Sequence, residues 1–325
     1  WEPVVRRVEL VRVRTGDDTW DAQPVEVLVT SRGPVVTGGP GQPDTFSLRT
    51  PAGVLDDLGF DALLPLLRSR SAADVTTAFD RWVSPVDNLL VADTSGHVEH
   101  RVVGRVPLRA DGGWTGWVED QPRRTGPLLV SANDRATAGF SRIGDDFAAP
   151  HRAHRLAEVV ADLAASAPLT PEALGAALAD DRQVAGEALL SLAARLADLS
   201  PAATALRDRL LAWDRRMATD SVEAALFASV RAGVVEAFAT APALAGVDSS
   251  PFGELYAPWF DLRGRLRIAL PALLAAEKPF GVDPLQALAA ALEEVAVQPD
   301  PAPWGDAHVV VPLTPAQQLG LPAPD

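Results

Sequence analysis

Histidines and carboxylates are the side chains of this sequence that could bind a metal or move protons. His151 and His154 lie three positions apart on an expected helix, where residues of that spacing share a face. Their spacing is not that of a zinc motif such as HExxH, and each stands next to an arginine, which favours a solvated helix start over a zinc site. His97 and His100 have the same spacing on an expected strand, so their side chains point to opposite faces and cannot form a metal pair.

Acidic doublets offer paired carboxylates at several places in the chain. Such a pair performs acid–base catalysis only when a cleft holds it, and adjacent residues of a helix or strand diverge. We therefore interpret the doublets as solvated surface charge. The sequence contains no GxSxG nucleophile motif, no phosphate-binding loop and no dinucleotide fingerprint. The doublets are Asp56-Asp57, Asp145-Asp146, Asp180-Asp181 and Glu293-Glu294.

Composition excludes several classes of function. The 325 residues carry a net charge of −14 with an isoelectric point near 4.8, which argues against nucleic acid and against anionic membrane surfaces as partners. Because there is no cysteine, disulfides, thiolate zinc sites and cysteine nucleophiles are excluded. Since no apolar run reaches about 18 residues, we expect no membrane span. With 47% hydrophobic and 22% charged residues, the chain is expected to form one large or two closely packed globular domains.

The pattern of apolar residues predicts three regions. Residues 1–150 are expected to be a β-rich core with an α/β insertion, residues 151–300 an alanine-rich helical region packed on it, and residues 301–325 a strand and a proline-rich tail. Within the first region, strands are expected at 8–13 and 25–29, 89–93 and 97–103, the last two joined by a glycine turn, and at 128–130. Helices are expected at 63–70 and 72–82, with an N-terminal cap formed by Ser71 and Asp74, and later at Pro171 and Pro201.

Short motifs in collinear order add a family resemblance to this outline. Together they resemble the β chain of penicillin acylases, which are amidohydrolases with an N-terminal nucleophile. Each motif is short, but their common order and spacing make a chance match improbable. The motifs are residues 30–36 (TSRGPVV), 47–49 (SLR), 66–71 (LLRSRS), 85–88 (PVDN) with 92–93 (AD) and 96–98 (GHV), 104–109 (GRVPLR), 130–133 (VSAN), 152–156 (RAHRL), 211–214 (LAWD) with 220–221 (DS), and 303–308 (PWGDAH).

The resemblance implies a fold and a mechanism. The fold would be α+β, with part of the stacked αββα sheets of this hydrolase class and a large helical region. In the family, a serine at the start of the β chain attacks the amide and its own α-amine acts as base. Trp1 is no nucleophile, so the chain is expected to be an inactive internal fragment that lacks the α chain and the remaining β-chain segments of its parent protein. A periplasmic or secreted location is favoured by the resemblance.

Four residues match positions that act in the family. The resemblance implies that Asn133 donates to the oxyanion and that Arg152 orients that asparagine and the α-amine region. Judged from the residues alone, Asn133 could instead be a cap or turn residue and Arg152 a surface arginine. Leu63 and Asp87 match acyl-pocket positions, and a buried carboxylate at Asp87 would disfavour an aromatic acyl group while leaving aliphatic ones open, including those of acyl-homoserine lactones.

Further predictions concern cofactors, the substrate and an alternative function. The resemblance implies chemistry that requires no cofactor, and it allows a structural calcium ion in the full-length protein, to which Asp145, Asp146 or Ser141 could contribute. The expected substrate is a small-molecule N-acyl amide, such as a β-lactam antibiotic. The alternative is a non-catalytic binding or interaction protein on the same scaffold, with the helices of residues 151–300 as one candidate surface.

Overall fold

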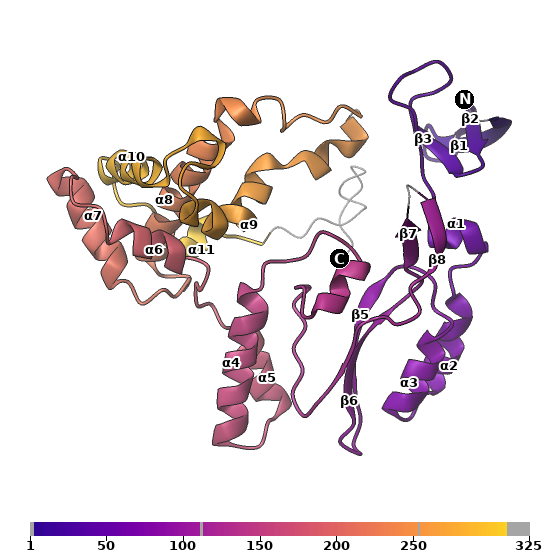
Figure 1. The fold of residues 1–325 in the computed structure, drawn as a ribbon, viewed down its shortest axis with the longest axis horizontal. Helices are drawn as coiled ribbons and strands as arrows, with labels where there is room; N and C mark the ends of the chain where they lie inside the picture. The colour runs from indigo at the N-terminus through magenta and orange to yellow at the C-terminus, as the bar shows by residue number, and fades with distance from the viewer. Residues whose placement is uncertain (1–2, 111–112, 253, 311–325) are drawn as a thin grey trace. The chain divides into compact units, whose positions relative to one another are not determined.

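A computed structural model describes residues 3–110, 113–252 and 254–310, and the chain divides into two compact units, Trp1–Ala167 and Pro168–Asp325 (Figure 1). Both helices and antiparallel sheets are present, as expected for the α+β class. The division follows helix α4 (His151–Ser166), whereas the sequence placed the boundary before it, at residue 150.

A four-stranded antiparallel sheet begins the first unit. Its strand order is β1-β2-β3-β4, and Val5 lies opposite Val29 at one end of the long β1–β2 pair while Arg14 lies opposite Trp20 at the other. β1 is largely exposed, with Val8 and Leu10 about 70% exposed, whereas residues 27–30 of β2 are partly buried. The strands are β1 (Val5–Arg14), β2 (Trp20–Thr30), β3 (Gly33–Thr37) and β4 (Phe46–Ser47).

A second, three-stranded antiparallel sheet carries the polar residues considered below. Its order is β5-β6-β9, and the predicted glycine turn between its first two strands is confirmed, with Gly96 at a φ of 87° that favours glycine. Two further strands, β7 and β8, pair beside it, and neither these nor β9 was predicted. The strands are β5 (Asp87–Ala92), β6 (Val98–Val103), β7 (Pro107–Ala110), β8 (Gly113–Trp117) and β9 (Arg123–Thr125).

Short helices and loops surround this sheet. The predicted cap is confirmed as a capping box, in which the Ser71 and Asp74 side chains each accept a hydrogen bond from the other residue's backbone N–H. The predicted strand at 128–130 is wrong, because the Val130 carbonyl accepts a hydrogen bond from the Arg124 side chain and pairs with no strand. The helices are α1 (Pro51–Leu55), η1 (Phe60–Ala62), α2 (Leu63–Arg68), α3 (Ala72–Phe79), η2 (Ala138–Arg142) and α4.

The second unit is helical, and its core surrounds one helix, α8 (Val222–Ala239). α8 buries apolar residues against α9 and α10, with Phe227 and Phe238 fully enclosed, while Ser229, Ala232 and Glu236 form its exposed side. The predicted starts at Pro171 and Pro201 are confirmed, each proline following a capping Thr or Ser. The other helices are α5 (Pro171–Leu178), α6 (Glu187–Ala193), α7 (Pro201–Ala212), η3 (Pro242–Leu244), η4 (Glu254–Phe260), α9 (Leu262–Ala275), η5 (Pro279–Gly281), α10 (Pro284–Ala296) and α11 (Trp304–Ala307).

A pair of hydrogen bonds joins two helices of this unit. The Glu293 carboxylate accepts hydrogen bonds from the Ser200 backbone and hydroxyl at 2.7 and 2.6 Å, which fastens α10 to the start of α7.

None of the helices in the described part of the chain combines the length and apolar character needed to cross a bilayer. The predicted tail falls largely outside the described residues, and the last two described positions, 309 and 310, are not in a strand.

We expect Leu288→Ala to lower the free energy of unfolding of the helical unit by about 2–5 kcal/mol, because Leu288 on α10 is 0% exposed and its truncation leaves a cavity. Urea unfolding followed by far-UV circular dichroism measures the change. The matched control is Leu178→Ala on α5, where the side chain is 76% exposed and the expected change is within about 0.5 kcal/mol. Equal losses in the two variants would contradict the assigned core.

Candidate functional site

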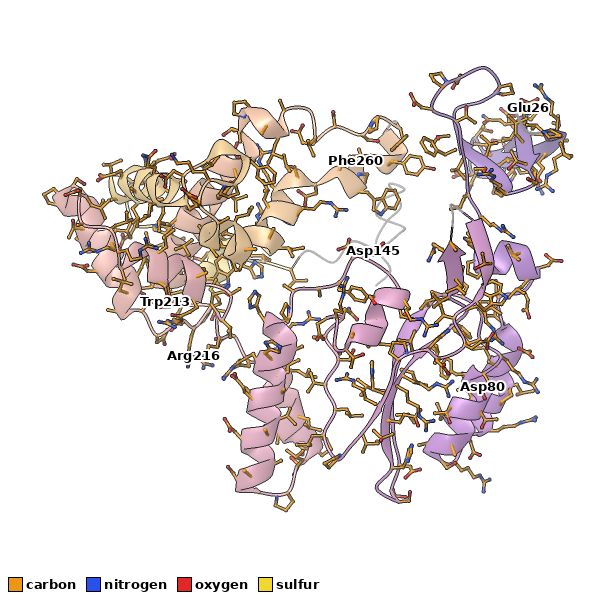
Figure 2. The ribbon with its side chains drawn as sticks, in the orientation of Figure 1. Glu26, Asp80, Asp145, Trp213, Arg216 and Phe260 are labelled. Carbon is orange, nitrogen blue, oxygen red and sulfur yellow. The ribbon has the colours of Figure 1, made fainter. Side chains whose placement is uncertain are left out.

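All four residues that the sequence singled out lie in the first unit. Leu63 is the first residue of α2, Asp87 is the first residue of β5, Asn133 lies in the loop between β9 and η2, and Arg152 lies in the first turn of α4. Figure 2 marks Asp145 in the loop that leads from η2 to α4. Asn133 is the residue with the most defined surroundings, and its contacts are described first.

The backbone of Asn133 is held in a left-handed conformation, with a φ of 62°. Its carbonyl accepts a hydrogen bond from the Ala148 N–H at 2.8 Å, and Asp134 forms an isolated parallel bridge with the same alanine. Asparagine tolerates positive φ better than most residues with a side chain, so the interpretation of Asn133 as a turn residue is compatible with the structure. The side chain itself is exposed and free to meet a ligand.

Four polar side chains form a continuous hydrogen-bond series that ends at Asn133, and we call it the asparagine network. Arg124 Nε donates to His100 Nδ1 at 3.3 Å, and His100 Nε2 lies 3.0 Å from Asn88 Oδ1. Asn88 Nδ2 donates to Asn133 Oδ1 at 3.4 Å. Asn88 and Asn133 are the two asparagines of the entire sequence.

His100 is the buried centre of this network. Its ring is 0% exposed and stacks on Phe140 of η2, with ring centroids 6.0 Å apart and planes 11° from parallel. Burial, and next the Arg124 charge, lower the pKa of His100, while Asp134 opposes the shift. The ring is therefore neutral at pH 7, with one nitrogen that donates and one that accepts.

Sequence reasoning did not identify Asn88, His100 or Arg124 as site residues. Two signals were available in the printed sequence, namely that asparagine occurs only twice and that a histidine stands within a predicted strand. The contact between His100 and Arg124 could not be predicted, because it depends on β9, which the pattern did not show.

The other predicted residues do not join Asn133 in this structure. Arg152 is exposed, and among the described residues no hydrogen bond or ion pair joins its guanidinium to Asn133. Leu63 is 47% exposed. Asp87 is also exposed, so the argument from a buried carboxylate against aromatic acyl groups does not hold for the chain by itself. The roles assigned to these three residues stay predictions.

Comparison with known proteins decides the family. The sequence profile described as penicillin amidase matches residues 1–323. The chain belongs to the penicillin amidase family. The resemblance found in the motifs is thereby confirmed.

Two relatives show what share of a family member's length this chain covers. The penicillin acylase 2 proenzyme of Pseudomonas sp. (strain SE83) is 29% identical over 298 residues, which cover 84% of this chain and 37% of that protein. The solved structure of thermostable penicillin G acylase from Alcaligenes faecalis, in orthorhombic form, aligns with a TM-score of 0.64 and 16% identity over 90% of this chain and 60% of that one. The chain thus has the N-terminal-nucleophile hydrolase fold expected from its motifs, and it spans less than two thirds of the length of either relative.

The described residues show no cluster of histidines and carboxylates that could hold the calcium ion allowed by the family resemblance. Asp145, Asp146 and Ser141 are all exposed. Among residues 3–110, 113–252 and 254–310, no three histidines or carboxylates gather closely enough to hold a metal. His151 and His154 lie on α4 as predicted, and they gain no third ligand from the described residues.

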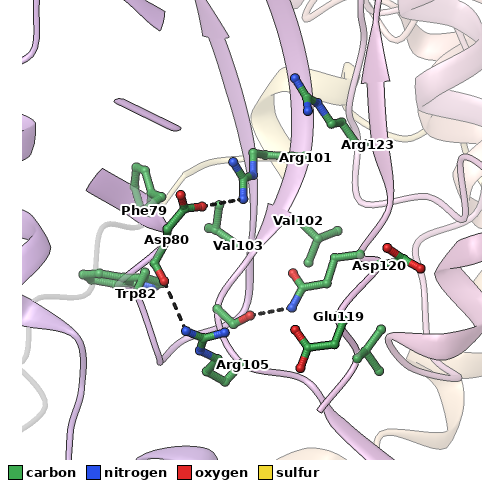
Figure 3. A pocket seen from close by; sticks show the side chains of 13 residues that line it. Phe79, Asp80, Trp82, Arg101, Val102, Val103, Arg105, Glu119, Asp120 and Arg123 are labelled. Carbon is green, nitrogen blue, oxygen red and sulfur yellow. Dashed lines mark hydrogen bonds and ion pairs between the residues drawn. The ribbon is translucent and has the colours of Figure 1, made fainter. Parts of the chain in front are cut away.

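A polar hollow of about 470 Å³ lies on the other face of the β5-β6-β9 sheet (Figure 3). Its arginines have carboxylate or carbonyl partners: Arg101 pairs with Asp80 at 3.0 Å, Arg105 donates to the Asp80 carbonyl at 3.2 Å, and Arg123 pairs with Glu99 at 2.8 Å. The two Asp80 contacts fasten the end of α3 to the sheet, and the Arg123–Glu99 pair joins β9 to β6. None of the four predicted site residues lines the hollow, so we assign it a structural role.

We expect the β5-β6-β9 sheet to lose stability as the pH falls through the ordinary titration range of histidine. Because the pKa of His100 is lowered in the folded chain, the unfolded chain binds a proton at a higher pH than the folded chain does. The stability that neutral His100 contributes is fully present above about pH 6.5 and is lost below it. Hydrogen exchange of the β6 amides, corrected for intrinsic rates, measures the effect between about pH 5 and 8.

Two variants make this test specific. His100→Gln removes the titrating group and should abolish the pH dependence below about pH 6.5. His154→Gln changes an exposed histidine on α4 and should leave the dependence as it is in the unaltered chain. A protection that is independent of pH in the unaltered chain would contradict a buried neutral His100.

Proposed function

We propose that the full-length protein containing this chain hydrolyses the linear amide C–N bond of N-acylated small molecules, through an N-terminal serine on a segment outside this chain. Membership of the penicillin amidase family supports the reaction, and the relative from Pseudomonas is named a proenzyme, which supports maturation from a precursor. The substrate classes that we propose are β-lactam antibiotics with an acyl side chain and acyl-homoserine lactones. The chain by itself supplies supporting residues and is inactive.

The proposed reaction has two steps. The serine Oγ forms a bond to the amide carbon, its proton passes through water to the free α-amine, and the carbonyl electrons move to oxygen. Collapse of this intermediate breaks the C–N bond, the leaving amine takes the proton, and water then hydrolyses the acyl-serine ester. An α-amine suits the role of base because its ordinary pKa of about 7.7–8.0 lies near neutrality.

The side chain of Asn133 is the observation that carries this proposal. It is exposed on a backbone fixed by Ala148, and its Oδ1 atom is occupied by a hydrogen bond from Asn88. The amide NH₂ group therefore faces outward as a neutral donor. A fixed donor of this kind stabilises the negative oxygen of the tetrahedral intermediate without having to reorganise during the reaction.

The remaining residues and partners are proposed on the family pattern. Arg152 would orient the α-amine region once the missing segments are present, because its guanidinium is exposed and can hold several acceptors. Leu63 and Asp87 would border the acyl group. The α chain and the remaining β-chain segments would be the partners, the chemistry would need no cofactor, and a structural calcium ion would draw most of its ligands from outside this chain. We propose export to the periplasm or beyond.

We expect Asn133→Ala in the mature full-length enzyme to lower kcat by about 10²–10³-fold with little change in KM, because the lost hydrogen bond forms in the transition state. Release of a chromogenic amine from an N-acyl amide measures both constants. Asp162→Ala, an exposed change on α4, is the control and should leave kcat unaltered.

Two results would contradict the proposal. One is a mature β chain whose N-terminal residue is not Ser, Thr or Cys, as read by Edman degradation or intact mass. The other is an Asn133→Ala enzyme with unaltered kcat. A full-length protein that binds N-acyl amides and cleaves none would favour a binding protein on the same scaffold.

A further inference from the structure

We propose that Arg124, His100 and Asn88 are positioning residues that fix the orientation of the Asn133 carboxamide, so that its NH₂ group, and never its carbonyl oxygen, faces the reacting carbonyl. The proposal rests on the proposed function for its catalytic consequence, but its structural content stands on the contacts of this chain alone. It assigns a role to three residues for which the sequence analysis proposed none in the site, although Asn88 belongs to the 85–88 motif.

Strand register brings three members of the asparagine network to one face of the β5-β6-β9 sheet. His100 on β6 lies directly opposite Arg124 on β9 and opposite Leu90 on β5. Asn88 stands two residues before Leu90, so its side chain projects from the same face as His100 and lies diagonal to it. Each strand of the sheet thus contributes one residue, and a slip of one residue in either pairing would break the series.

The direction of every hydrogen bond follows from the arginine. A guanidinium can only donate, so His100 Nδ1 must be the accepting nitrogen and its single proton must lie on Nε2. That proton is donated to Asn88, which places Oδ1 of Asn88 toward the ring and its Nδ2 toward Asn133. Asn133 then accepts through Oδ1 and presents Nδ2 outward.

Burial keeps this direction from reversing. His100 is enclosed by the sheet and by Phe140, which is 2% exposed, and charging the ring beside Arg124 is unfavourable because both groups would be cations. A ring flip would place Cδ2–H and Cε1–H where Nδ1 and Nε2 now stand, so that Arg124 would lose its acceptor and Asn88 its donor. The neutral Nε2-protonated form is the one that satisfies all the neighbours.

The same guanidinium also fixes the backbone that carries Asn133. Arg124 Nη2 donates to the Val130 carbonyl at 2.8 Å, three residues before Asn133, and the Ala148 N–H holds Asn133 itself at 2.8 Å. Side chain and backbone of the asparagine are therefore positioned from one cross-strand contact. This matters because a carboxamide rotated by half a turn would present an oxygen to the developing oxyanion, which replaces attraction by repulsion.

The first test needs no activity. In the chain labelled with ¹⁵N-histidine, the nitrogen resonances of His100 report the tautomer, and we expect a protonated Nε2 and an unprotonated Nδ1 at pH 7. His100→Gln identifies the signal. A proton on Nδ1, or a doubly protonated ring, would overturn the network whether or not the full-length protein hydrolyses amides, so that this failure is distinct from failure of the proposed function.

The second test uses the mature full-length enzyme with a chromogenic N-acyl amide. Asn88→Asp keeps the size of the side chain and its acceptor for His100 but removes the donor to Asn133, and we expect kcat to fall roughly 10- to 100-fold with KM nearly unchanged. Added to Asn133→Ala, it should cost little more, because Asn88 acts only through the Asn133 carboxamide, which that variant already lacks. Full additivity of the two losses, or an unaltered kcat for Asn88→Asp, would overturn the proposal.

Two further variants separate positioning from general stability. His100→Gln can accept from Arg124 and donate to Asn88, whereas His100→Phe can do neither, so kcat should be higher in the glutamine variant; equal values in two folded enzymes would count against the network. Asp80→Asn is the matched control, an isosteric change that weakens the Arg101 ion pair on the opposite face of the sheet, and it should leave kcat unchanged.

Discussion

The contact between Arg124 and His100 is the constraint on which the candidate site depends. It joins two neighbouring strands, it determines which ring nitrogen of a buried histidine carries the proton, and through Asn88 it determines the orientation of Asn133. Because a guanidinium cannot accept a hydrogen bond, the direction of the series is fixed at its first member. His100 is the buried member of the series, and the pairing of both its ring nitrogens offsets the cost of its burial.

The two units are organised by different interactions. In the helical unit, α8 buries most of its surface as apolar side chains against neighbouring helices, so that packing is the main interaction that positions it. In the first unit, large apolar side chains such as Val8, Leu10 and Leu67 remain exposed, and directional polar contacts are correspondingly prominent around the β5-β6-β9 sheet. The chain spans 37% of the curated relative's length. In a complete enzyme, contacts with residues outside this chain therefore matter most for this first unit, where the large apolar side chains are exposed.

How much could be predicted from the sequence depended on whether the signal was local. The capping box at Ser71, the proline-led helices and the glycine turn at Gly96 were predictable, because neighbouring residues determine them. Strand β9 was not, because three residues of sequence Arg-Arg-Thr carry no periodicity, and without it neither the partner of His100 nor the loop carbonyl of Val130 could be placed. Motif resemblance found Asn133, while the residues that orient it required the register of three strands.

The most direct test of this account is a crystal structure of the mature full-length enzyme with a boronate or phosphonate that mimics the tetrahedral intermediate. The account predicts that Asn133 Nδ2 lies about 2.7–3.1 Å from the oxygen that stands for the oxyanion, while Oδ1 still accepts from Asn88. An inhibitor bound to the N-terminal nucleophile with its oxyanion held elsewhere, or an Asn133 whose carboxamide has turned its oxygen toward the inhibitor, would contradict it.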